Sequence, residues 1–150
     1  MNYNIDHNIR NLLIKAGWNE NRQVNRFQLT DQISKNGYEV LPEVVDFLEV
    51  FEGLTIRFPN LKNGINDDIT LDFKKATELE CPERIHEDYQ PRIGKKLCII
   101  GTAYRDHFVL IMAEDGKVYG GYDNYLVRIS DTGIGAIEAI INNEKFTEIP

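Results

Sequence analysis

The stretch VVDFLEVFEGL, residues 44–54, decides the interpretation of the whole chain. Four apolar residues recur in it at i, i+3, i+4 and i+7, which places them along one side of an α-helix. They are Val44, Phe47, Leu48 and Phe51. The acidic residues step round the opposite side, and they are Glu43, Asp46, Glu49 and Glu52. The stretch therefore predicts a helix with one apolar face and one acidic face.

The residues on either side of this helix predict where it begins and ends. Pro42 fits the first helical turn, where its missing N–H costs nothing, and Gly53 fits the left-handed position just past the end. Beyond Gly53 the apolar period changes to two over Leu54–Phe58, which is typical of a strand, and Pro59 ends it. We therefore expect a helix that leads directly into a strand, with both apolar faces in one core.

Outside this region the sequence predicts helices near both ends and a run of strands between them. Helices are expected over Ile5–Ala16 and Val24–Lys35, around Ala76–Leu79, after Pro82, and from a cap at Asp131 or Thr132 onward. Further strands are expected over Ile69–Phe73, Leu97–Thr102, Phe108–Ala113, Lys117–Tyr122 and Leu126–Ile129, with an exposed loop over Asn60–Asp68. The fold class predicted is α+β: a single domain, residues 1–150, with a mainly antiparallel sheet of about six strands flanked by N-terminal helices and a C-terminal helix.

Composition limits the functional classes. With 150 residues and 42% hydrophobic content, the chain is one domain's worth of globular protein. We expect no signal peptide and no membrane span, because the longest apolar runs fall far short of roughly 20 residues. Two cysteines cannot make a disulfide framework, so we expect a reduced, cytoplasmic protein.

The acidic side chains are concentrated in the middle of the chain. The formal net charge is −7. Residues 38–90 hold 13 acids and 5 bases, a balance of −8, and the remainder holds 11 acids and 12 bases, a balance of +1. An acidic surface repels phosphates and attracts basic partners, so direct nucleic-acid binding is disfavoured. The same acidity also fits a solvated face that keeps the protein soluble.

The motifs that could carry catalysis are incomplete. Cys81, His86, Cys98 and His107 include metal-ligand types, but no CxxC or HxxxH pair brings two of them together. A Cys–His nucleophile pair would have to form in the fold, and nothing in the sequence activates either cysteine. The Asp131–Gly135 turn lacks both the GxGxxG and the P-loop patterns. We therefore expect no catalytic residue, no cofactor and no metal.

Two aromatic features have a structural and a functional interpretation. Tyr119, Tyr122 and Tyr125 could stack bases, but few basic residues accompany them, which favours cross-strand packing. Trp18, the only tryptophan, is expected to be a core or inter-helix anchor because of the large area that it buries.

In the order and spacing of its motifs, the chain resembles the SUKH superfamily of bacterial immunity proteins, specifically its third subgroup, which has the SMI/KNR-like fold. The motifs that carry the resemblance are AGWNENRQV (16–24), FLEVFEGLTI (47–56), LCIIG (97–101), DGKVYG (115–120) and GAIEAII (135–141). Glu52-Gly53 stands where this family often has Gly-Gly, and Asn21-Arg22 where it often has Gly-Arg.

The resemblance implies a noncatalytic inhibitor that binds and neutralises a cognate polymorphic toxin. Toxins linked to this superfamily are typically nucleases or nucleic-acid deaminases. A general protein-interaction or regulatory scaffold domain of the same fold is the alternative, and a small hydrolase is a third. The acidic residues that we expect to face a basic toxin are Glu43, Asp46, Glu49, Asp67, Asp68, Glu83, Glu87 and Asp88.

Overall fold

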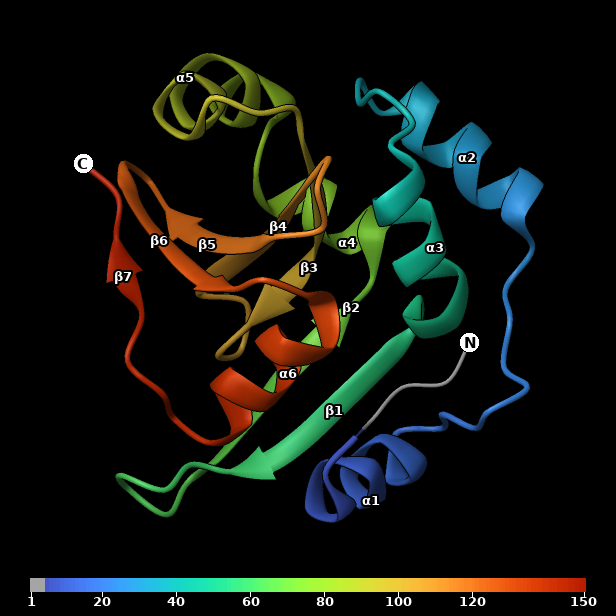
Figure 1. The fold of residues 1–150 in the computed structure, drawn as a ribbon, viewed down its shortest axis with the longest axis vertical. Helices are drawn as coiled ribbons and strands as arrows, with labels where there is room; N and C mark the ends of the chain where they lie inside the picture. Colours follow the sequence, from blue (N-terminus) through green and yellow to red (C-terminus); the bar gives the residue numbers. More distant parts are fainter. Residues whose placement is uncertain (1–4) are drawn as a thin grey trace.

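One antiparallel sheet, with its strands side by side in chain order, organises the molecule (Figure 1). The computed structural model describes residues 5–150. The strands are β1 (Leu54–Pro59), β2 (Asn66–Leu71), β3 (Leu97–Ala103), β4 (Phe108–Ala113), β5 (Val118–Tyr122), β6 (Tyr125–Ser130) and β7 (Thr147–Glu148). Every adjacent pair is antiparallel, so the predicted meander is confirmed.

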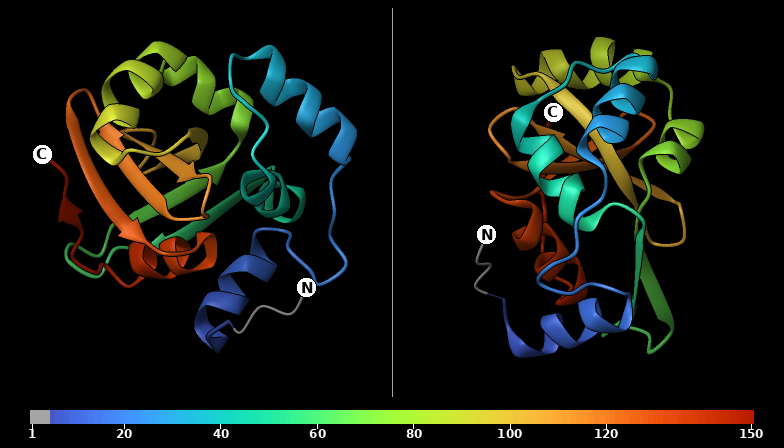
Figure 2. Two further views of the ribbon diagram at one scale, coloured as in Figure 1. Left: turned by 45° about the horizontal axis from the view of Figure 1, so that its top comes forward. Right: turned by 90° about the vertical axis from the view of Figure 1, so that its right-hand side faces the viewer.

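Helices cover both faces of this sheet. They are α1 (His7–Lys15), α2 (Arg26–Lys35), α3 (Pro42–Phe51), α4 (Phe73–Leu79), the π-helical η1 (Arg84–Tyr89), α5 (Gln90–Ile93) and α6 (Gly133–Ile141). Figure 2 shows η1 and α5 on one side of the strands and α6 on the other. The α+β class predicted from the sequence is confirmed.

The central helix and its junction with β1 form as the sequence predicts. Val44, Leu48 and Phe51 are fully buried, and Phe47 is 6% exposed and packs its ring 4.9 Å from that of Phe51. Gly53 adopts a φ of 92° and donates its N–H to the Leu71 carbonyl at 2.6 Å. This glycine turns the chain from the helix into the sheet.

The prediction that Glu52 belongs to the exposed acidic face of the helix is wrong. The helix ends at Phe51, and Glu52 has a ψ of 133°, which is not helical. Its side chain therefore leaves the acidic face and turns inward, where its Oε1 accepts the Phe73 N–H at 2.8 Å.

Several predicted boundaries are also corrected. Phe73 begins α4 and does not belong to β2, because the Asp72 side chain accepts the Lys75 N–H at 3.1 Å and caps the helix. Residues 66–68 are strand and not loop, since they pair with 57–59 across the β1–β2 hairpin. Residues 24 and 25 precede α2, where Asn25 is the cap. β7 was not expected, because two residues are too few to show alternation.

Two adjacent glycines allow large rings to reach β5 from both faces. A Cβ on Gly120 would lie 2.0 Å from the Phe108 ring, and one on Gly121 would lie 2.8 Å from the Tyr89 hydroxyl. The Tyr89 hydroxyl donates to the Asp123 carbonyl at 2.6 Å, which ties η1 to the β5–β6 turn. Any side chain at either glycine would displace a packed aromatic residue.

We predict that Phe51→Ala destabilises the protein by about 3–5 kcal/mol, because the fully buried ring would leave a cavity in the core. Chemical denaturation measures the change. The matched control is Phe27→Ala, which removes a ring that is 80% exposed and should alter stability by less than about 0.5 kcal/mol. Equal midpoints for Phe51→Ala and the wild type would contradict the assignment of this face to the core.

Candidate functional site

The connector between α1 and α2 is fixed to the end of α3 by an arginine. Arg22 donates to the carbonyls of Val50 at 2.7 Å and Glu52 at 2.5 Å, and the Val24 N–H donates to the Glu49 carbonyl at 2.8 Å. The last carbonyls of a helix have no partner inside the helix, so a guanidinium satisfies them well. The motif Ala16–Val24 thus includes a clamp on α3.

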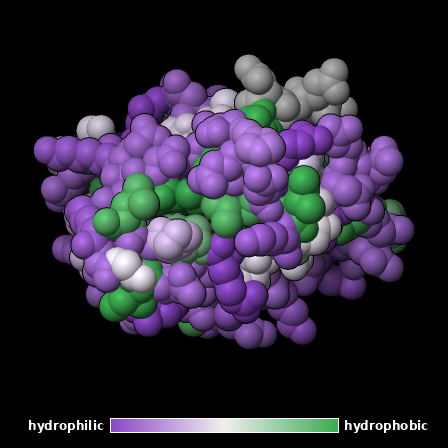
Figure 3. All heavy atoms as spheres, turned by 90° about the horizontal axis from the view of Figure 1, so that it is seen from below, coloured by the Kyte–Doolittle hydropathy of each residue, from purple (hydrophilic) through white to green (hydrophobic). Residues whose placement is uncertain are grey.

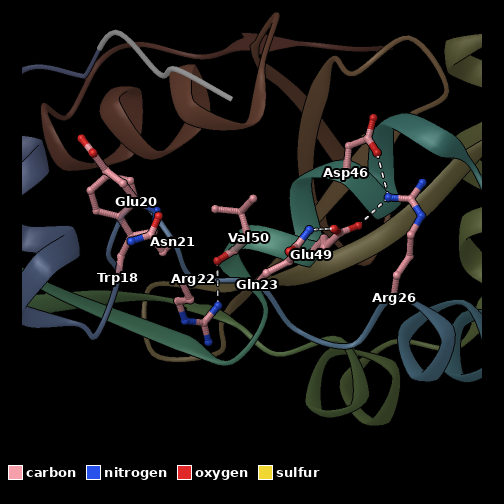
Figure 4. A pocket seen from close by; sticks show the side chains of 9 residues that line it. All are labelled: Trp18, Glu20, Asn21, Arg22, Gln23, Arg26, Asp46, Glu49 and Val50. Carbon is pink, nitrogen blue, oxygen red and sulfur yellow. Dashed lines mark hydrogen bonds and ion pairs between the residues drawn. The ribbon is translucent and has the colours of Figure 1, made fainter.

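A polar cleft of about 450 Å³ lies between this connector and α3 (Figure 4). Trp18, Glu20, Asn21, Arg22, Gln23, Arg26, Asp46, Glu49 and Val50 line it. The Arg26 guanidinium bridges the carboxylates of Asp46 at 3.0 Å and Glu49 at 2.5 Å, and Gln23 also donates to Glu49. Two of the predicted toxin-facing carboxylates are therefore already paired within the protein.

Trp18 anchors the base of the connector. Its side chain is 4% exposed, and the Arg10 guanidinium lies 5.1 Å from its ring centroid. Its indole N–H finds no hydrogen-bond partner among residues 5–150. The prediction that Trp18 is a buried anchor is confirmed.

The Glu52 carboxyl is the most strongly perturbed acid beside the cleft. Burial raises its pKa to about 7, although the Phe73 N–H and the Arg22 charge favour ionisation. Its Oε2 is enclosed and has no hydrogen-bond partner in the described part of the chain. The group is therefore partly protonated near neutral pH, and it lies between the end of α3 and the start of α4.

The predicted residues on β2 and at the start of α3 lie in separate surroundings. Glu43 is exposed beside the β4–β5 turn, where its Oε2 lies 3.5 Å from the position of a Cβ on Gly116. Asp67 is half-buried and accepts from the Asn60 side chain at 3.2 Å. Asp68 accepts the Arg105 N–H at 3.0 Å through its carboxylate, so it supports the β3–β4 turn.

The remaining three predicted residues lie on η1 and at its N-cap, Glu83. A hollow of about 340 Å³ is lined by Glu83, Glu87, Asp88, Arg84 and Cys81. Asp88 lies 3.5 Å from Arg84 and 3.3 Å from Arg92, whereas Glu83 and Glu87 are exposed and form no ion pair within residues 5–150. The structure thus distributes the eight carboxylates over α3, β2 and η1 and does not collect them in one patch.

The cysteines and histidines have separate local contacts. Cys98 is buried in β3, and this burial raises the pKa of its thiol far above the ordinary value, whereas Cys81 is exposed. His86 contacts the Gly37 carbonyl at 2.9 Å, and His107 contacts the Tyr104 carbonyl at 2.8 Å. Within residues 5–150 no three His, Cys, Asp or Glu side chains form a group that could hold a metal ion.

Seen from below the view of Figure 1, the surface has no broad apolar face. Figure 3 shows small hydrophobic areas separated by hydrophilic ones. Exposed apolar side chains include Ile14 on α1 and Leu61 and Ile65 in the β1–β2 loop. No helix among the described residues is long and apolar enough to cross a membrane.

Sequence reasoning missed the roles of Arg22 and Glu52. Arg22 binds carbonyls 28 and 30 residues away, and Glu52 binds an N–H 21 residues away. No short-range pattern encodes such contacts. The one local signal was that Glu52 follows the last apolar residue of the helical stripe and precedes glycine, where a helix often ends.

The model of one family, SUKH-3 immunity protein, matches residues 5–143, so the chain belongs to this family. The curated proteins and solved structures to which the chain was compared gave no match. The resemblance seen in the sequence is thereby confirmed.

We predict that Glu52→Gln makes stability less dependent on pH. With a pKa near 7 in the folded protein and 4.5 as its ordinary value, native Glu52 keeps a proton that the unfolded chain loses between these pH values. The unfolding free energy of the wild type should therefore fall as pH rises from 4.5 to 7.

Glutamine stays neutral and keeps an acceptor for the Phe73 N–H. The unfolding free energy of the variant, relative to that of the wild type, should therefore increase as pH rises across this window. The difference should reach roughly 3 kcal/mol above pH 7. Urea denaturation at several pH values measures both curves, and their difference isolates this carboxyl. Parallel curves would show that Glu52 is ionised in the folded protein throughout the window.

Proposed function

We propose that this protein is a noncatalytic immunity protein that acts in the cytoplasm and neutralises a cognate toxin, a nuclease or a nucleic-acid deaminase. The observation that carries the proposal is membership of the SUKH-3 immunity protein family over residues 5–143. Such a protein works by occupying the toxin and needs no reaction of its own.

The distribution of charge supports a basic partner. Residues 38–90 carry the balance of −8, and they include α3, β2 and η1. Enzymes that hold a phosphate backbone need a positive surface. An acidic protein bound there would compete with the nucleic acid and would also associate faster through electrostatic attraction.

Among the eight carboxylates, those on η1 are the first candidates for the contact. Glu83 and Glu87 are exposed, and their charges are not neutralised by an ion pair within the described chain. Asp46 and Glu49 are held by Arg26, and Asp68 supports a turn. Six residues of π-helix are unusual, and π-helical turns occur frequently at functional sites. Glu43 on α3 and Asp67 on β2 are further candidates at separate positions.

The decisive experiment pairs the protein with its cognate toxin domain, sought among the genes next to its own. We expect the two proteins to copurify after coexpression and the immunity protein to restore growth to cells that make the toxin. A folded protein that neither binds the toxin domain nor protects cells would overturn the proposal. Capture of an intracellular partner without protection would instead support the interaction-scaffold alternative.

We predict that the double reversal of Glu83 and Glu87 to Lys slows association with the toxin roughly tenfold at low salt and flattens the salt dependence. Stopped-flow mixing measures both quantities. The matched control reverses Glu114 and Glu144, two exposed acids outside residues 38–90, and should bind at nearly the wild-type rate. Equal slowing in both variants would assign the effect to net charge alone.

A further inference from the structure

Several aromatic rings meet at one end of the sheet. The register pairs Ala103 with Phe108 and Tyr122 with Tyr125, so the β3–β4 and β5–β6 turns emerge at the same end. The start of β2 joins them, since the Tyr104 N–H donates to the Asp68 carbonyl at 2.9 Å. We call Asp67, Tyr104, Arg105, Tyr122, Asp123 and Tyr125 the sheet-end surface.

A buried ring supports the tyrosines of this surface. Phe108 is 6% exposed, and its ring centroid lies 5.7 Å from that of Tyr104 and 6.4 Å from those of Tyr122 and Phe146. The Tyr122 ring lies 5.1 Å from that of Tyr125 and is 51% exposed. The tyrosines therefore stand on a packed base and lose little freedom on binding, which favours them as interface anchors.

The β3–β4 turn is held in a conformation that its residues disfavour. Tyr104, Arg105 and Asp106 have φ values of 55°, 55° and 67°, three successive left-handed residues without a glycine. The Asp68 carboxylate holds the Arg105 N–H, and Asp106 accepts from Thr102 at 2.8 Å and pairs with Lys75 at 3.0 Å. Strain maintained by such contacts is characteristic of functional sites.

The sheet-end surface holds two carboxylates and one cation, the exposed Arg105, so it is net negative. Asp67 and Asp123 carry carboxylates that form no ion pair within residues 5–150. Burial raises the pKa of Tyr104 to about 12, and the charge of Asp67 contributes to the rise, so its field reaches the ring. An apolar partner would bury these carboxylates without compensation. A guanidinium would satisfy them and lie against the tyrosine faces.

We propose that the sheet-end surface receives an arginine side chain from a basic protein partner, with its guanidinium against the tyrosine rings and paired with the carboxylate of Asp67 or of Asp123. The protein already makes the same kind of contact internally, with the Arg92 guanidinium 5.9 Å from the Tyr89 ring centroid. The inference rests on the proposed function for the identity of the partner, the toxin. The arginine site itself is tested without the toxin.

The first experiment titrates the protein with acetyl-arginine amide and, as the uncharged isostere, acetyl-citrulline amide. We expect arginine to shift the ring resonances of Tyr122 and Tyr125 and citrulline to leave them in place. Tyr122→Leu, which keeps apolar area but removes the aromatic face, should abolish the response. Phe27→Ala, which removes an exposed ring elsewhere, should keep it. Equal shifts with both amides, or none, overturn the proposal.

The second experiment measures affinity for the cognate toxin domain identified under the proposed function. Tyr122→Leu should weaken binding at least tenfold, and Phe27→Ala should stay within twofold of the wild type. If Tyr122→Leu binds the toxin domain as tightly as the wild type does, the toxin binds elsewhere on the protein. The proposed function would then remain intact. An arginine response without any toxin binding would reject the proposed function and keep the arginine site.

The strained turn provides a paired test. Arg105→Gly and Arg105→Ala remove the same side chain, but only glycine relieves the positive φ. Arg105→Gly should unfold at a higher denaturant concentration than Arg105→Ala and bind the toxin domain more weakly. Identical binding by the two variants would show that strain does not prepare the surface.

Sedimentation tests a different occupant of the surface. A dimer that Tyr122→Leu dissociates would assign the surface to a second copy of this chain.

Discussion

The contact on which most of the fold depends is that between Arg22 and the end of α3. Its guanidinium holds the carbonyls of Val50 and Glu52, where the chain passes from the helix into β1. Burial lowers the pKa of Arg22, and the charge of Glu52 opposes this effect. One side chain thus satisfies the helix end and fixes the α1–α2 connector beside the start of β1.

Several acidic side chains of this chain have structural roles, so acidity alone does not identify a functional surface. Asp46 and Glu49 bind Arg26, Asp68 holds the β3–β4 turn, and Glu52 caps the first N–H of α4. These carboxylates support the architecture. Glu83 and Glu87 are exposed and unpaired among the described residues, so their charge is available to a partner. Only part of the negative charge of this chain is therefore free to act at an interface.

The sequence predicted elements whose signals are local and missed those that depend on distant partners. The apolar stripe of α3 and the alternation in β1 identified both elements, because burial on one face imposes a period. Residues 66–68 looked like a loop because Asn and Asp favour turns, yet pairing with 57–59 makes them strand. Likewise, no local pattern announces that Glu52 turns inward or that Tyr104–Asp106 adopt positive φ without glycine.

The position of Glu52 shows how a family scaffold can acquire a property of its own. The resemblance places glycine often at this position, and glycine would leave the Phe73 N–H without a carboxyl acceptor. Here the carboxyl supplies that acceptor, but its second oxygen is enclosed without a partner, so the charged form is costly. The β3–β4 turn is a second example, because Asp68 and Lys75 stabilise a backbone conformation that the residues of the turn disfavour. In both places a local cost persists because contacts from distant parts of the chain offset it. A scaffold stabilised in this way can change its surface turns without losing its core.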